Sequence, residues 1–82
     1  MTKDELKMLI RGSTRKNETF PLADLAKLKS VANVMLEIDR ETNDYYYKVD
    51  INDLVSKEFD YSIISNNGWE LSLDEQYMFL FL

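Results

Sequence analysis

The chain has 82 residues, of which 45% are hydrophobic and 12% aromatic, and its formal net charge is −5. This length suits one domain with a single core, and the composition is that of a folded protein rather than a disordered one. The sequence contains neither cysteine nor histidine, which excludes disulfides, thiol nucleophiles and the usual transition-metal ligands. We therefore predict a single domain over residues 1–82 with no cofactor and no metal.

The charge is unevenly distributed along the chain. Residues 1–30 carry seven basic and four acidic side chains, a net charge of +3, whereas residues 31–82 carry three basic and eleven acidic ones, a net charge of −8. Solvated helix faces rich in lysine explain such a pattern in most proteins. The alternative is that the acidic part steers a basic partner toward the molecule.

The first thirty residues predict two helices. Thr2 and Glu5 have the spacing of a capping box, so a helix is expected from Lys3 to Arg11. Gly12 stands where a left-handed C-cap is expected. After a polar loop, Pro21 suits the first turn of a second helix that runs to about Ser30.

Two period-two segments then predict a hairpin. Residues 32–39 and 45–51 each alternate apolar and polar side chains, and the polar residues 40–44 between them are turn-forming. Residues 31–40 also fit a helical stripe that would extend the second helix, so strand and helix both remain open there. We favour the strand.

A helix and a second hairpin complete the prediction. Asn52 or Asp53 can cap a helix that ends in the turn residues 66–68, and strands are expected over 69–74 and 77–82. The predicted fold class is α+β in the order α-α-β-β-α-β-β, a small single domain. Two hairpins form an antiparallel sheet of about four strands, and helices pack on it.

The alternation assigns side chains to two faces of this sheet. The larger apolar set is expected on the first face, toward the core: Val34, Leu36, Ile38, Tyr45, Tyr47, Val49, Ile51, Trp69, Leu71, Leu73, Tyr77, Phe79 and Phe81. The second face would carry a smaller apolar cluster beside charged residues, and these are the candidate partner-binding residues: Met35, Tyr46, Met78, Leu80, Leu82, Glu37, Asp50 and Glu70. The last strand is apolar at every position, which is typical of a strand covered on both sides. The first helix, a partner protein or a second copy of the chain could supply that cover.

Other chemistry finds little support in the sequence. Residues 39–50 have oxygen ligands at the spacing of a calcium loop, but Asp44 replaces the required glycine and Asp50 the required glutamate. The loop over 11–17 is basic enough to attract phosphate, although the protein as a whole is anionic. We expect no enzymatic activity and no small-molecule substrate, and nucleic acid is disfavoured as a partner.

The predicted function is that of a non-enzymatic, acidic protein–protein interaction module that docks through the second sheet face, on another protein or on itself as a homodimer. The alternative is an acidic nucleic-acid mimic that inhibits a DNA- or RNA-handling protein. No stretch approaches the roughly 20 apolar residues of a membrane span, and residues 1–10 do not resemble a signal peptide. We expect a cytoplasmic location. Small size and acidity are typical of accessory proteins of bacteria or bacterial viruses.

Overall fold

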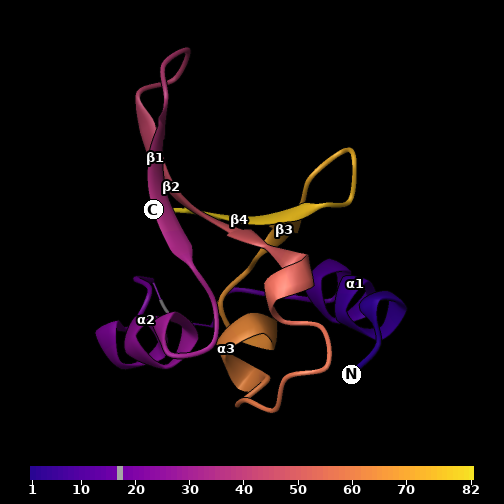
Figure 1. Ribbon diagram of the computed structural model, residues 1–82. Helices are drawn as coiled ribbons and strands as arrows, with labels where there is room; N and C mark the ends of the chain where they lie inside the picture. The colour runs from indigo at the N-terminus through magenta and orange to yellow at the C-terminus, as the bar shows by residue number, and fades with distance from the viewer. Residues whose placement is uncertain (17) are drawn as a thin grey trace.

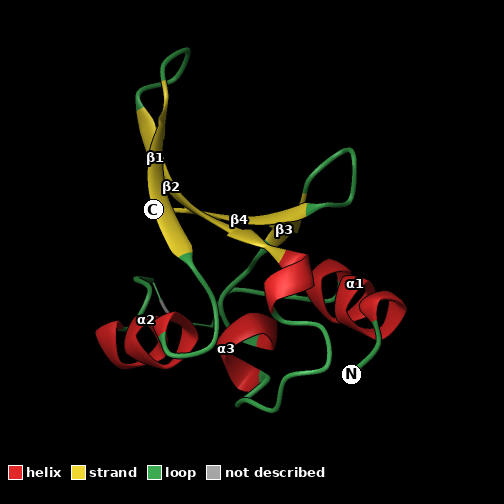
Figure 2. Cartoon of the chain, in the orientation of Figure 1, coloured by secondary structure: helices red, strands yellow, loops and turns green. Residues whose placement is uncertain are grey.

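The computed structural model describes residues 1–16 and 18–82, and it confirms the α+β class and the order of elements (Figures 1 and 2). The elements are α1 (Lys3–Arg11), α2 (Leu22–Lys29), β1 (Val34–Asp39), β2 (Asp44–Asp50), the 3-10 helix η1 (Ile51–Asp53), α3 (Ser62–Ser65), β3 (Glu70–Leu71) and β4 (Tyr77–Phe81).

The four strands form one antiparallel sheet in the order β1-β2-β4-β3. The two predicted hairpins are therefore joined through β2 and β4, and β1 and β3 are the edges. The β1–β2 hairpin extends well past the rest of the molecule, while the helices gather at the other end of the sheet (Figure 1). Part of this hairpin consequently has no helix beneath it.

The strand prediction for the ambiguous segment is confirmed. β1 pairs with β2 without interruption, from Val34 opposite Val49 to Asp39 opposite Asp44. Asn43 closes the turn with a φ of 59°, a left-handed conformation that asparagine tolerates better than most residues. Polar turn chemistry and period-two alternation agree here, so the strand wins over the helix.

The two ends of α1 differ in how well they were predicted. The capping box is present, because the Glu5 N–H donates to Thr2 Oγ1 over 3.2 Å and the Thr2 N–H donates to Glu5 Oε1 over 3.1 Å. Gly12 has a φ of −86°, so the left-handed C-cap is wrong. The glycine with positive φ is Gly68, at 71°.

The helix expected after the first hairpin is wrong in extent. The segment divides into η1 and the four-residue α3, which are separated by turns and irregular chain. Ser56 has a φ of 65°, which no α-helix accommodates. α3 begins only at Ser62, whose N–H and hydroxyl donate hydrogen bonds to Asp60 Oδ1. The left-handed residue and this local turn thus interrupt the helix that the apolar spacing predicts.

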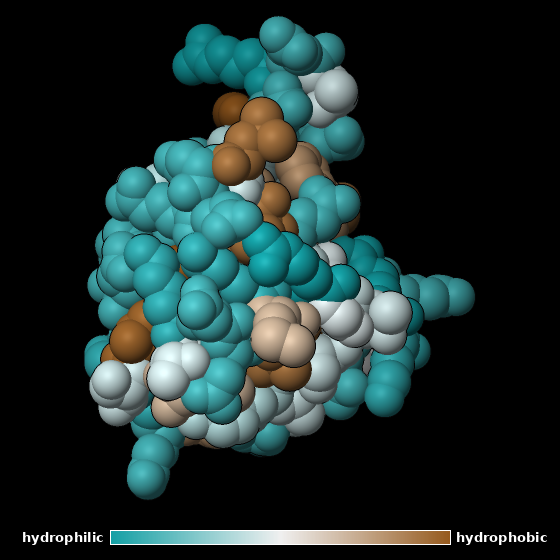
Figure 3. Space-filling view, turned by 90° about the vertical axis from the view of Figure 1, so that its right-hand side faces the viewer, coloured by the Kyte–Doolittle hydropathy of each residue, from teal (hydrophilic) through white to brown (hydrophobic). Residues whose placement is uncertain are grey.

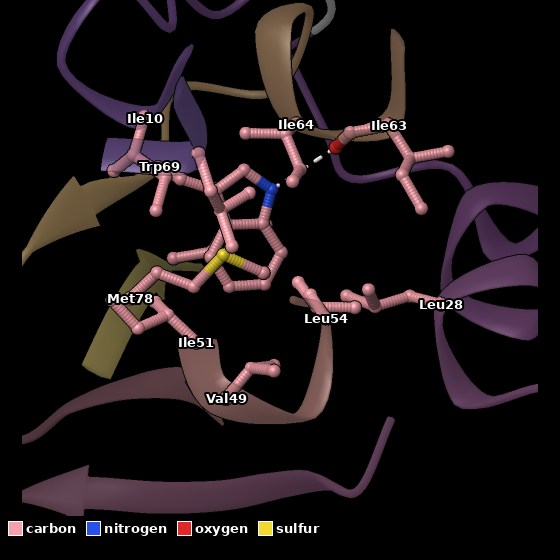
Figure 4. Packing of buried hydrophobic residues seen from close by; sticks show 11 residues of the cluster. Ile10, Leu28, Val49, Ile51, Leu54, Ile63, Ile64, Trp69 and Met78 are labelled. Atoms are coloured by element: carbon pink, nitrogen blue, oxygen red, sulfur yellow. Dashed lines mark hydrogen bonds between the residues drawn. The ribbon is translucent and has the colours of Figure 1, made fainter. Parts of the chain in front are cut away.

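One buried cluster holds the fold together, and it lies between the first face of the sheet and the helices (Figure 4). It consists of Leu6, Ile10, Leu28, Val49, Ile51, Leu54, Ile63, Ile64, Trp69, Met78 and Leu80. The Trp69 indole N–H donates to the Ile63 carbonyl over 3.0 Å, which satisfies the ring's polar atom inside the core. Each such side chain contributes roughly 1.5–3 kcal/mol on burial.

The prediction for the faces of β4 is wrong. Met78 pairs with Val49 and Leu80 with Tyr47, so Met78 and Leu80 point into the core and are fully buried. Tyr77, Phe79 and Phe81 consequently lie on the second face. The strand is apolar at every position, so alternation could not choose between two registers that differ by one residue and exchange the faces.

Two further residues leave the predicted first face. Leu73 lies in the turn between β3 and β4 and is fully exposed, because β3 ends at Leu71. Ile51 is buried as expected, but it belongs to η1 rather than to β2.

Candidate functional site

The second face of the sheet carries no helix in the described residues 1–16 and 18–82. α1 buries Leu6 and Ile10, α2 buries Leu28, and these residues join the cluster beneath the first face. Figure 1 likewise shows the helices on one side of the sheet. The alternative in which the first helix covers the second face is therefore wrong.

Aromatic rings form the centre of this open face. We call the group Tyr46, Tyr77, Phe79 and Phe81 the aromatic face. The Tyr46 ring lies 5.4 Å from that of Phe79 and 5.3 Å from that of Phe81, centroid to centroid. Phe81 is 36% exposed, and the other three are partly exposed. Ring packing in this range stabilises the side chains in one arrangement.

A lysine and a glutamate anchor the aromatic face from within. Lys48 Nζ lies 4.2 Å from the centroid of the Tyr77 ring, a cation–π contact, and 3.9 Å from Glu37 Oε1. The Tyr46 hydroxyl donates to Glu37 Oε2 over 2.8 Å. This hydrogen bond to a carboxylate raises the pKa of Tyr46 above its ordinary value, since it favours the protonated phenol. Glu37 is thereby held over β2.

Five of the eight residues predicted to bind a partner lie on this face: Met35, Glu37, Tyr46, Asp50 and Glu70. Glu70 pairs with Phe79 and is exposed, and Asp50 accepts hydrogen bonds from the Asn52 N–H and the Gln76 side chain. Both acidic residues therefore flank the aromatic rings.

The other three predicted residues lie elsewhere. Met78 and Leu80 are in the core, and Leu82 is on the first-face side, where its N–H donates to the Tyr45 carbonyl over 2.9 Å. Sequence reasoning missed Tyr77, Phe79 and Phe81, which take the places given to Met78, Leu80 and Leu82. One signal pointed to Tyr77: its hydroxyl needs a polar partner, which makes full burial less favourable for it than for Met78 or Leu80. In the structure this hydroxyl accepts from the Gln76 side chain over 3.2 Å.

A second exposed apolar area lies on the first face, where the hairpin projects past α2. It consists of Leu36, Ile38, Tyr45 and Leu82, which are 57%, 38%, 54% and 56% exposed. We call it the hairpin patch. A hollow of about 180 Å³ separates its base from α2 and is lined by Phe20, Leu22, Leu25 and Tyr47 among others. Figure 3 shows hydrophobic side chains where the hairpin leaves the body of the molecule.

A larger hollow of about 540 Å³ lies between α1 and the β3–β4 hairpin. Its polar groups are already engaged within the protein. The Ser13 hydroxyl donates to the Ile64 carbonyl and accepts from the Trp69 N–H, and the Arg11 guanidinium pairs with Glu75 over 2.5 Å. This hollow therefore offers few free groups to a ligand.

The acidic side chains and the basic loop were also candidates for metal and phosphate sites. No group of three or more acidic side chains among residues 1–16 and 18–82 is arranged to hold a metal ion. In the basic loop, Arg11 pairs with Glu75 and Arg15 donates to the Phe81 carbonyl over 2.5 Å. Asn17, the last residue of that loop, lies outside the described residues.

A scan against protein-family models, a search of curated proteins and a search of solved structures each find no match to this chain. None of the helices in the part of the chain that the structure describes has the length and apolar character needed to cross a membrane. The aromatic face and the hairpin patch are the two exposed apolar surfaces at which a partner could bind.

Proposed function

We propose that the chain is a non-enzymatic docking module that binds another protein through the aromatic face. One observation carries the proposal: β4 is apolar on both sides, and the described residues cover only the side of Met78 and Leu80. Strands of this kind are usually covered on both faces. A partner protein would supply the missing layer.

The composition of the face supports a protein partner. Tyrosine and phenylalanine are enriched in the centre of interfaces, where they provide large contact areas for few rotatable bonds. The rings already pack on one another, and the Tyr46 hydroxyl is held by Glu37. Little side-chain freedom is therefore lost on binding, which reduces the entropic cost of association.

The charges around the rings indicate the kind of surface that fits. Glu70 is exposed beside Phe79, and Asp50 lies beside Tyr77. With a net charge of −8 over residues 31–82, the face suits a partner with an apolar centre and basic residues around it. We place the interaction in the cytoplasm, in keeping with a sequence without cysteine.

The test is affinity capture from the source cells with the immobilised protein and two variants. Phe79→Ser removes the central ring of the aromatic face. Leu73→Ser is the matched control, because Leu73 is apolar and fully exposed but lies in the β3–β4 turn and is not one of the residues of that face. We expect Phe79→Ser to lose the captured protein and Leu73→Ser to retain it, with a difference in affinity of at least tenfold, as expected of an interface hot spot.

Two results would contradict this function. The first is a captured protein that binds wild type and Phe79→Ser equally well while both variants keep the wild-type circular dichroism spectrum. The second is an affinity that falls steeply with ionic strength and survives Phe79→Ser, which would identify an acidic mimic acting through charge alone.

A further inference from the structure

β1 is a long open edge of the sheet. Among residues 1–16 and 18–82 its only strand partner is β2, with which it runs for six residues in unbroken register. The other edge, β3, has two residues. Natural proteins protect such edges with lysine, proline or a bulge, and β1 has none of the three.

The backbone groups at this edge belong to three alternate residues. The Leu82 N–H donates to the Tyr45 carbonyl, so Tyr45 directs its backbone groups toward β4 and away from β1. Tyr45 stands opposite Ile38, which is therefore in a non-hydrogen-bonded pair with β2. Ile38 consequently directs its N–H and C=O outward, and alternation along the strand gives Leu36 and Val34 the same direction.

The same three residues carry apolar side chains on the first face. Leu36 is 57% and Ile38 is 38% exposed, since α2 does not reach this part of the hairpin. The outward-directed backbone groups and the apolar side chains thus belong to the same residues, Val34, Leu36 and Ile38. A strand added at this edge would form hydrogen bonds with these backbone groups and bury the exposed side chains.

The acidic side chains of β1 do not guard the edge. Glu37 is held over β2 by the Tyr46 hydroxyl at 2.8 Å. Asp39 accepts a hydrogen bond from the Glu41 N–H over 3.0 Å within the turn. Both carboxylates are therefore engaged inside their own hairpin.

We propose that β1 pairs antiparallel with β1 of a second copy of this chain, with Leu36 on the twofold axis. Val34 then lies opposite Ile38 of the second copy, and Leu36 opposite Leu36. Each of these pairs exchanges two backbone hydrogen bonds, because all three residues direct their groups outward. The four strands of each copy join into one continuous sheet.

Charge selects this register over its neighbours. With Leu36 on the axis, Glu37 stands opposite Met35 of the second copy, so no like charges meet directly. A shift that centres Glu37 would place two carboxylates opposite each other, which destabilises a strand pair. A shift that centres Met35 would leave Ile38 opposite residue 32, before the strand begins. The edge formed by Val34, Leu36 and Ile38 is therefore complementary to itself in this register and not in the neighbouring ones.

The proposed dimer is independent of the docking function. The twofold axis is perpendicular to the sheet, so the aromatic faces of both copies lie on the same side and stay open. The dimer uses the edge and the hairpin patch. A variant that no longer dimerises can therefore still be tested for binding of the partner protein, and a variant that no longer binds the partner can still be tested for dimerisation.

Light scattering on the purified protein tests the assembly. We expect wild type to have the mass of a dimer and Leu36→Lys that of a monomer, because a lysine at an edge strand opposes pairing. Leu73→Lys is the control with the same change at a fully exposed site, and it remains dimeric. Phe79→Ser also remains dimeric. The proposal is overturned by a monomeric wild type at millimolar concentration, by a dimeric Leu36→Lys, or by loss of the dimer in Phe79→Ser.

Cross-linking tests the register. The sequence has no cysteine, so Leu36→Cys introduces a unique thiol next to its symmetry mate. A short bis-maleimide should join the two copies. In Glu41→Cys the two thiols lie in the hairpin turns beyond opposite ends of the paired strands, more than about 20 Å apart, and should stay unlinked. Efficient cross-linking at residue 41 but not at residue 36 would exclude this pairing.

Discussion

Gly68 lies where two distant segments of the chain run side by side. The Thr14 N–H donates to the Ser65 carbonyl and the Lys16 N–H to the Asn66 carbonyl, both over 3.0 Å. A Cβ atom on Gly68 would stand 3.2 Å from the backbone nitrogen of Arg15. Together with a φ of 71°, this contact makes glycine the residue that fits.

Gly68→Ala should therefore lower the free energy of unfolding by about 1–3 kcal/mol, from the left-handed backbone and the close contact with Arg15 together. Urea denaturation measures the change. Gly12→Ala is the control, because Gly12 has a φ of −86° and its nearest neighbour to an added Cβ is at 3.5 Å. We expect that control to be neutral or slightly stabilising. Equal losses for both variants would refute the argument.

At the scale of elements, Glu75 links the β3–β4 turn to α1. Its carboxylate accepts from Lys7 Nζ over 2.8 Å and from the Arg11 guanidinium over 2.5 Å. The hydrogen bond and charge of Lys7, followed by the charge of Arg11, lower the pKa of Glu75 below its ordinary value. The two cations lie one helical turn apart, so a single carboxylate can engage both.

This shift predicts how stability depends on pH. Because the pKa of Glu75 is lower in the folded state, its carboxylate stabilises the fold above the ordinary glutamate pKa, and this contribution is lost as the pH falls through the folded value. Between about pH 7 and about pH 3, wild type should lose more stability than Glu75→Gln. The difference should shrink in high salt, since the Glu75 side chain is 41% exposed. Thermal denaturation at each pH measures it.

An exposed glutamate outside this contact, changed in Glu58→Gln, is the control, and its pH profile should follow that of wild type. Parallel pH profiles for Glu75→Gln and wild type would show that the ion pairs of Glu75 do not contribute to the stability of the fold.

The elements also show what sequence reasoning could reach. The β1–β2 hairpin was predictable, because alternation and a polar turn both specify it. The faces of β4 were not, since Tyr77 through Phe81 are apolar at each position and only the pairing with β2 fixes their direction. The broken helix after β2 was missed because the left-handed Ser56 leaves no mark on apolar spacing.

The candidate site was accordingly predicted in part. Met35, Glu37, Tyr46, Asp50 and Glu70 lie on the open face, as their alternation within β1, β2 and β3 requires. The error lies in β4 and the residue after it, where Met78, Leu80 and Leu82 were predicted in place of Tyr77, Phe79 and Phe81. The predicted faces of this last strand were exchanged, as a one-residue offset in register would do.

At the scale of the whole molecule, one core joins residues from Leu6 to Leu80. Each helix contributes to this cluster, and Trp69, the only tryptophan, is 2% exposed within it. A chain of this length with one cluster should unfold as a single unit. The tryptophan then reports on the same event as the helices do.

The fluorescence of Trp69 and the far-ultraviolet circular dichroism should give superimposable urea transitions, with a slope of about 1 kcal/mol per molar urea. The same pair of signals should coincide in the monomeric Leu36→Lys variant, which removes any dissociation step from the comparison. Two separated midpoints would contradict a single cooperative unit.

The connections of α1 bear on how the chain acquires its structure during synthesis. Ser13, at the end of this helix, bonds to Ile64 and Trp69, and Lys7 bonds to Glu75. The helix is nine residues long, too short to persist alone in water. While the ribosome is still translating the middle of the message, α1 has none of these anchors. We therefore expect α1 to form only after the region around residue 75 has left the exit tunnel of the ribosome.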